Sequence, residues 1–188
     1  MMISAIFDAC VLYPAPLRDF LLHLAEDELI DSYWSEEIRE EWIRSLLRNR
    51  PDLKRENLER TCREMDFHFP DSLVQGYKSI IPTLTLPDPN DRHVLAAAIF
   101  MKVKYIVTFN LTDFPPSALQ PYQVEAISPD NFVMQVIKYN SKYLIETVAR
   151  HRAVLTRLPK TVDEYLATLE KQGLPKTVTF LRERKDDL

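Results

Sequence analysis

The chain has 188 residues, of which 46% are hydrophobic and 28% are charged, and its formal net charge at pH 7 is -4. This length and balance indicate one globular domain with room for a small appendage. Two glycines against 13 prolines argue against a turn-rich all-β sandwich and against a low-complexity protein. The negative net charge argues against indiscriminate nucleic-acid binding, although local basic clusters matter more than the sum.

The apolar N-terminal segment from Met1 to Leu12 does not resemble a signal peptide, because it is short, lacks a basic lead-in and is interrupted by Asp8. No later apolar run is long enough to span a bilayer. We therefore expect a cytoplasmic protein without membrane association. Its two cysteines, Cys10 and Cys62, are then reduced thiols rather than a disulfide, and Cys10 is expected in the core.

The first elements follow a strand, helix, strand, helix order. Ile3–Phe7 is a short apolar run that predicts a buried strand with Asp8 at its C-terminal end. Apolar residues at helical spacing predict a helix over 17–24, after a loop marked by two prolines. Residues 29–34 predict a second strand, and Ser35 predicts the N-cap of the helix that follows.

The middle of the chain has weaker patterns. Pro51 is expected to end the helix that Ser35 begins. Further helices are expected over 53–65 and around 73–77, followed by a β-like, proline-punctuated stretch over 80–86.

The pattern after residue 87 returns to helices alternating with strands. Asp88 and Pro89 predict a helix start as N-cap and first helical residue. Strands are expected over 105–108 and 123–127, and Ser128-Pro129-Asp130 predicts the start of another helix, running through residue 136. Alternating strands and helices predict an α/β fold with a central parallel sheet.

From about residue 140 the patterns are helical only, and Thr161-Val162-Asp163-Glu164 predicts a capping box. We therefore divide the chain into an α/β domain over 1–139 and an all-α C-terminal extension over 140–188. The extension carries basic residues that could bind phosphates, although a solvated helix face is an equally good interpretation. These residues are Lys142, Arg150, His151, Arg152, Arg157 and Lys160.

Several acidic residues follow the expected strands, where ligands of open parallel sheets bind. Asp8, Asp91 and Asp113 all lie at such carboxyl ends. Carboxylates within a few Å repel one another, so their cluster requires a cation or a shared proton. Oxygen-only ligands favour Mg²⁺ or Mn²⁺ over zinc.

A fourth acid, Glu41, lies three residues beyond Ile38 on the helix after Ser35 and can face the sheet, whereas Glu40 projects further outward. Each acid also has a simpler interpretation. Asp8 could cap a turn, Asp91 could stabilise a helix N-terminus, and Asp113 could form an Asx turn. A site is therefore indicated only by the four acids taken together. We expect His93, beside Asp91, to serve in packing or backbone support rather than as a general base.

Four segments occur in a distinctive order: Phe7-Asp8, Ser35 to Glu41, Asp88 to Ala98, and Val107 to Pro115. This order resembles the PIN-domain family, and most closely its VapC-type toxin ribonucleases, over Met1 to Asp130. The resemblance implies a PIN-like three-layer α/β/α sandwich. It also places Asp8, Glu41, Asp91 and Asp113 on the family's four acidic positions, as catalytic residues and ligands of one or two Mg²⁺ or Mn²⁺ ions.

The same resemblance places Thr108 and Asn110 on the supporting polar positions at a strand end, while Glu37 or Glu40 could take the place of Glu41. It implies a metal-dependent endoribonuclease that acts as the toxin of a type II toxin-antitoxin system. The expected partners are RNA and a small antitoxin whose tail enters the site, commonly with an arginine. The alternative is a catalytically inactive PIN scaffold that binds RNA or a protein.

A homodimer is also possible, with the apolar segments Phe20-Leu21-Leu22 and Trp42-Ile43 as candidate interface surfaces. Core packing is the default interpretation of both segments.

Overall fold

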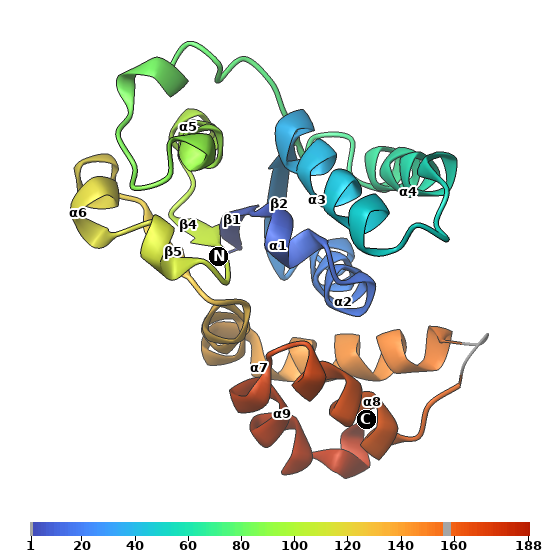
Figure 1. Cartoon of the computed structure of the whole chain (residues 1–188). Helices are drawn as coiled ribbons and strands as arrows, with labels where there is room; N and C mark the ends of the chain where they lie inside the picture. The colour runs from blue at the N-terminus through green and yellow to red at the C-terminus, as the bar shows by residue number, and fades with distance from the viewer. Residues whose placement is uncertain (1, 156–158) are drawn as a thin grey trace. The chain divides into compact units, whose positions relative to one another are not determined.

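The structure is a computed structural model that describes residues 2–155 and 159–188 (Figure 1). The chain forms two compact units. One consists of Ser4–Tyr13 and Asp31–Ile127, and the other of Pro14–Ile30 and Ser128–Leu188 together with the start of the chain. In the described parts of the chain, no helix combines the length and the apolar character that a membrane span requires.

The first unit is built on a five-stranded sheet with the order β3-β2-β1-β4-β5. Its strands are β1 (Ile3–Phe7), β2 (Ile30–Ser35), β3 (Leu73–Val74), β4 (Tyr105–Val107) and β5 (Glu125–Ile127). The pairs β1–β4, β4–β5 and β2–β3 are parallel, and Phe7 is in register with Val107. The predicted α/β class with a parallel sheet is confirmed. Strands β2 and β3 lie on one side of β1, and β4 and β5 lie on the other, so the order of the strands switches side between β1 and β4.

The helices of this unit are α1 (Ala9–Leu12), α3 (Glu36–Asn49), α4 (Arg55–His68), α5 (Arg92–Met101) and α6 (Pro116–Leu119). Helix α3 packs on α1 and α4, and α5 packs on β4. The expected caps are present: the Ser35 hydroxyl accepts a hydrogen bond from the Ile38 amide at 3.2 Å. The Asp88 carboxylate accepts one from the Asn90 amide at 2.8 Å, at the start of a 3-10 turn that leads into α5.

Two predictions for the middle of the chain are wrong. The helix expected around 73–77 is absent, because Leu73 and Val74 form β3 and pair with Trp34 and Ser35. The β-like stretch over 80–86 contains a 3-10 turn, Ile81–Thr83, and no strand. Both segments are too short for their own pattern to decide, and pairing with a distant strand determines the first of them.

The second unit is helical and contains α2 (Ala15–Glu26), α7 (Pro129–Val154), α8 (Val162–Lys171) and α9 (Pro175–Arg182). Helix α2 packs on α7 and α8, and α9 packs on both α7 and α8. The buried Asp130 carboxylate accepts hydrogen bonds from the backbone amides of Lys176 and Thr177, each at 2.9 Å, and so fastens the start of α9 to α7.

The expected helical C-terminal part is confirmed, with the capping box at Thr161. The helix that begins at Ser128 does not end at residue 136. It continues to Val154 through Asn140, whose φ of -140° departs from helical geometry. The division at 139/140 coincides with this interruption and stays a prediction.

The basic residues of this part are largely engaged in internal contacts. Arg150 pairs with Asp27 at 2.5 Å, and Arg152 donates to the backbone carbonyls of Lys160 and Leu188 at 3.1 and 3.2 Å. His151 is buried, so it does not face phosphates. Lys142 lies 3.9 Å from Glu146, and Lys160 donates to the Thr168 hydroxyl at 2.5 Å. Arg157 lies outside the described residues.

The apolar segments considered for an interface belong to the core. Phe20, Leu21 and Trp42 are fully buried and Ile43 is 4% exposed, which contradicts their use as dimer surfaces. Whether the protein forms a homodimer stays a prediction.

Candidate active site

The site is organised around Asp8, which directly follows β1 at the point where the order of the strands switches side. Its carboxylate accepts hydrogen bonds from the Ala9 amide at 2.7 Å and from the Thr108 hydroxyl at 2.6 Å. Thr108 follows β4, is fully buried, and accepts a hydrogen bond from the Asn110 amide at 2.9 Å. The neighbouring strand ends are thus joined by side chains, and the orientation of the Asp8 carboxylate is fixed.

Cys10 also belongs to this group, which corrects its expected place in the core. Its thiol donates a hydrogen bond to the Asp8 carboxylate at 3.2 Å and accepts one from the Phe109 amide at 3.3 Å. Burial, with the negative charge of Asp8, raises the pKa of the Cys10 thiol to about 12. The group is therefore a neutral thiol at physiological pH and not a nucleophile.

Helix α3 directs Glu41 toward the same cleft, where its carboxylate accepts a hydrogen bond from His93 Nε2 at 2.9 Å. The carboxylate can only accept, so Nε2 carries the proton. Burial lowers the pKa of His93, but the hydrogen bond and charge of Glu41 outweigh burial and the net pKa is raised. His93 thus supports Glu41 from α5, a partnership that the sequence spacing did not predict.

The two acids that could replace Glu41 are engaged elsewhere. Glu37 accepts a hydrogen bond from the Tyr77 hydroxyl and pairs with Lys78 at 3.1 Å. Glu40 pairs with Arg55 at 2.5 Å. Among these three acids of α3, Glu41 is the one that lines the cleft.

The pKa of Asp91, which precedes α5, is raised by its surroundings in the site. Burial and, to a smaller extent, the negative charges of its acidic neighbours together raise its pKa to about 6. These neighbours are Asp8, Asp88, Asp113 and Glu41. The carboxylates that the sequence places far apart are therefore close enough to repel one another.

Asn110 and Asp113, which both follow β4, have different positions relative to the cleft. Asn110 is exposed and lines the cleft. Asp113 ends a 3-10 turn, and its backbone amide donates to the Asn110 carbonyl at 3.1 Å. Its charge acts on Asp91, but Asp113 does not belong to the residues that line the cleft.

The cleft has a volume of about 370 Å³. Its walls are formed by α1, α3, the residues that follow β1 and β4, and the end of the 3-10 turn before α5. The lining residues are Asp8, Ala9, Cys10, Tyr13, Glu41, Trp42, Ser45, Arg48, Asn49, Asp91 and Asn110.

Sequence reasoning missed several of these residues. Ser45, Arg48 and Asn49 lie four, seven and eight residues after Glu41, so helical spacing alone would have placed them on the face that carries Glu41. Arg48 is exposed and brings a positive charge to a lining whose other charged residues are acids. Asn49 donates a hydrogen bond to the Tyr13 hydroxyl at 3.1 Å.

A family model described as "PIN domain" matches residues 4–112, which is more than half of the chain. The chain belongs to the PIN-domain family. A second model, described as "VapC50 C-terminal domain", matches residues 129–183 and therefore covers α7, α8 and α9.

Among curated proteins, the chain is similar to "Putative ribonuclease VapC50" of Mycobacterium tuberculosis, with 46% identity over 59 residues. The similar segment covers 31% of this chain and 34% of that protein, so the chain spans about a third of the length of the relative that it matches. No solved structure matches the chain.

The acidic cleft of this PIN domain fits a divalent cation. Asp8, Glu41 and Asp91 offer oxygen atoms only, which is the donor set that Mg²⁺ and Mn²⁺ prefer. Burial and the negative charges of the neighbouring acids raise the pKa of Asp91, so these carboxylates repel one another. A bound cation would relieve this repulsion.

Proposed function

We propose that the protein is a metal-dependent endoribonuclease and the toxin of a type II toxin-antitoxin system. The observation that carries the proposal is the convergence of Asp8, Glu41 and Asp91 in one cleft of a PIN domain. The partial similarity to a protein named as a ribonuclease supports RNA as the substrate.

Asp8, Glu41 and Asp91 would hold one or two Mg²⁺ or Mn²⁺ ions, and Asp113 would complete the site directly or through water. A bound ion supplies charge neutralisation at the scissile phosphate and activation of the attacking water. We expect hydrolysis to leave a 5′-phosphate and a 3′-hydroxyl.

The protein's own residues prepare this cleft. The Thr108 hydroxyl and the Ala9 amide hold the Asp8 carboxylate in one orientation, and His93 does the same for Glu41. Fixed ligands lose less conformational freedom on binding, so the site is preorganised. Exposed Arg48 at the cleft would bind a flanking phosphate of the RNA, which positions the strand without reading its sequence.

The acidic cleft also suits the expected antitoxin. A guanidinium group placed between Asp8, Glu41 and Asp91 would neutralise the charges that a metal ion neutralises, and would compete with it. We propose that a small antitoxin protein inhibits the enzyme in this way, and that the protein acts in the cytoplasm. Titration of the Mn²⁺-loaded protein with an arginine-containing peptide should release Mn²⁺, whereas the same peptide with glutamine in place of arginine should not.

The deciding experiment is incubation of total RNA with the purified full chain in the presence of Mg²⁺, Mn²⁺ or a chelator. Asp8→Asn is compared with wild type, because asparagine keeps the shape of the side chain and can still accept from the Ala9 amide. Asp71→Asn is the matched control, since Asp71 is exposed and does not belong to the cleft.

We expect discrete products that require a divalent ion, are lost in Asp8→Asn and persist in Asp71→Asn. Intact RNA under every condition, together with measurable RNA binding by a folded protein, would favour the inactive PIN scaffold instead. Cleavage that persists in Asp8→Asn would refute the assignment of the site.

A further inference from the structure

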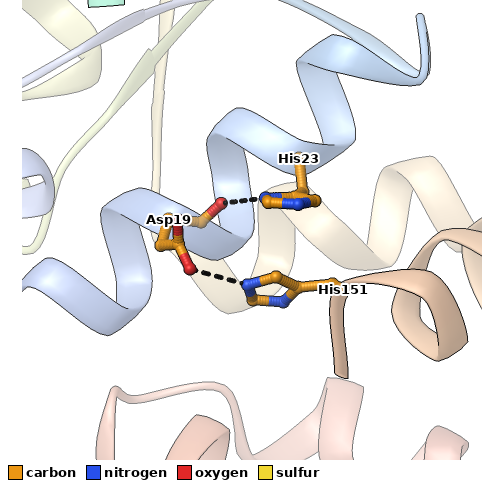
Figure 2. A group of neighbouring side chains, drawn as sticks. All are labelled: Asp19, His23 and His151. Carbon is orange, nitrogen blue, oxygen red and sulfur yellow. Dashed lines mark hydrogen bonds and ion pairs between the residues drawn. The ribbon is translucent and has the colours of Figure 1, made fainter. Parts of the chain in front are cut away.

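The helical unit contains a second group of potential metal ligands, which is separate from the acidic cleft. Asp19 and His23 lie on α2, four residues apart, and His151 approaches them from α7 (Figure 2). One ligand atom from each side chain lies within 4.8 Å of the other two. The spacing of four residues places Asp19 and His23 on one face of the helix.

The hydrogen bonds of His23 leave one ring nitrogen suited to a metal. Its Nδ1 lies 3.2 Å from the backbone carbonyl of Asp19. A carbonyl oxygen can only accept, so Nδ1 carries the proton and the lone pair of the neutral ring is on Nε2. Nε2 faces Glu26, whose carboxylate lies 4.0 Å away. A carbonyl that fixes the tautomer of a histidine in this way is characteristic of metal-binding histidines.

His151 is buried and has a partner on each nitrogen. Nε2 lies 2.8 Å from the Asp19 carboxylate, and Nδ1 lies 2.7 Å from the Tyr165 hydroxyl. A hydroxyl group can donate or accept, so Tyr165 can support either tautomer of His151. If a cation replaces the proton on Nε2, Nδ1 becomes the donor to Tyr165 and no buried polar atom loses its partner.

The dimensions of the group are compatible with a tetrahedral ion. Zinc binds imidazole nitrogen at about 2.0–2.1 Å and carboxylate oxygen at about 2.0–2.2 Å, which separates tetrahedral ligand atoms by roughly 3.3 Å. His151 Nε2 and the Asp19 carboxylate lie 2.8 Å apart, and every separation between the three ligand atoms is within 4.8 Å. A rotation of the half-buried His23 side chain would bring its free nitrogen toward the other two ligands.

We propose that Asp19, His23 and His151 form a zinc site that fastens α2 to α7, with water or the Glu26 carboxylate as the fourth ligand. Two imidazole nitrogens and one oxygen favour zinc over the hard cations Mg²⁺ and Mn²⁺, which prefer oxygen alone. The ion would stabilise the helical unit, because its ligands come from helices that are distant in sequence. The inference does not depend on the proposed nuclease activity.

The test is Zn²⁺ affinity, measured by competition with a chromophoric chelator on the full chain. Asp8→Asn and Asp91→Asn are combined in the background to weaken binding of zinc in the acidic cleft. His23→Ala is then compared with His68→Ala, a matched control because His68 is exposed on α4 and does not belong to the group. Circular dichroism verifies that each variant is folded.

We expect one Zn²⁺ per chain in the background protein, an affinity at least about 100-fold lower in His23→Ala, and no change in His68→Ala. Tyr165→Phe should lower the affinity by about tenfold, since the phenol fixes the orientation of His151. With Co²⁺ as a probe, the background protein should give visible absorption typical of imidazole coordination that His23→Ala lacks. Equal Zn²⁺ affinity in the background protein and His23→Ala, or loss of all binding in the background protein, would overturn the proposal.

Discussion

Replacement of Asp91 by asparagine should stabilise the metal-free protein and abolish most of its stabilisation by metal. Burial and the negative charges of its neighbours raise the pKa of Asp91 to about 6, so ionisation of this group opposes folding at neutral pH. Asparagine keeps the size of the side chain and removes the charge. Repulsion with Asp8, Glu41 and Asp113 is then relieved without a metal ion.

The magnitude follows from the change in pKa. A rise from 3.8 to about 6 corresponds to roughly 3 kcal/mol at about 1.36 kcal/mol per pKa unit. Asp91 is only half-buried, so solvent screening reduces this to about 1.5 kcal/mol. The N-terminus of α5 favours the negative charge by about 0.5 kcal/mol. The net gain in free energy of unfolding is therefore about 1 kcal/mol, or an increase in Tm of roughly 2–4 °C.

The stability difference between Asp91→Asn and wild type should depend on pH. A group whose pKa is raised on folding contributes stability that is fully present below its unfolded pKa and is lost as the pH rises through about 6. The advantage of Asp91→Asn over wild type should therefore be largest above pH 6 and should decrease toward about pH 4.

Thermal unfolding followed by circular dichroism, in chelator and in Mn²⁺, measures both effects at each pH. Wild type should gain Tm with Mn²⁺, and Asp91→Asn should gain much less, because a ligand that binds only the folded state stabilises it. Asp71→Asn should behave as wild type. A metal-free Asp91→Asn that is folded but no more stable than wild type at about pH 7.5 would refute the electrostatic reasoning.

Two further predictions concern the residues that support the cleft. Thr108→Val removes the hydroxyl that donates to Asp8 at 2.6 Å and should lower Mn²⁺ affinity by about 10- to 100-fold, measured by electron paramagnetic resonance of free Mn²⁺. Unchanged affinity, equal to that of the exposed control Thr85→Val, would show that this hydrogen bond does not prepare the site. Arg48→Ala should weaken RNA binding and reduce the slope of log affinity against log salt by about 0.7, the value for one phosphate contact on a single strand. An identical salt slope in titrations of wild type and variant would remove Arg48 from the RNA path.

The sequence by itself determined the features that depend on neighbouring residues. The apolar run before Asp8 gave β1, Ser35 began α3, and Thr161 formed the capping box of α8. A cap requires only a side chain and a backbone amide two or three residues later, so its signal lies within a few positions. The order of acidic residues after predicted strands indicated a site for a different reason. Parallel strands bring their carboxyl ends to one edge of the sheet, so residues that follow the strands gather there.

Only the tertiary structure decided which distant residues meet. Leu73 and Val74 form β3 because they pair with β2, and their own pattern favoured a helix. The bond of Glu41 to His93 joins residues 52 positions apart, and that of Asp19 to His151 spans 132 positions. Side chains from separate helices or strands make contact through packing of the whole unit, and no short spacing encodes that distance. The sequence could therefore indicate Asp8, Glu41 and Asp91 as one group, with Thr108 at a strand end beside them. It could not indicate the contact of Glu41 with His93 or the second group of ligands.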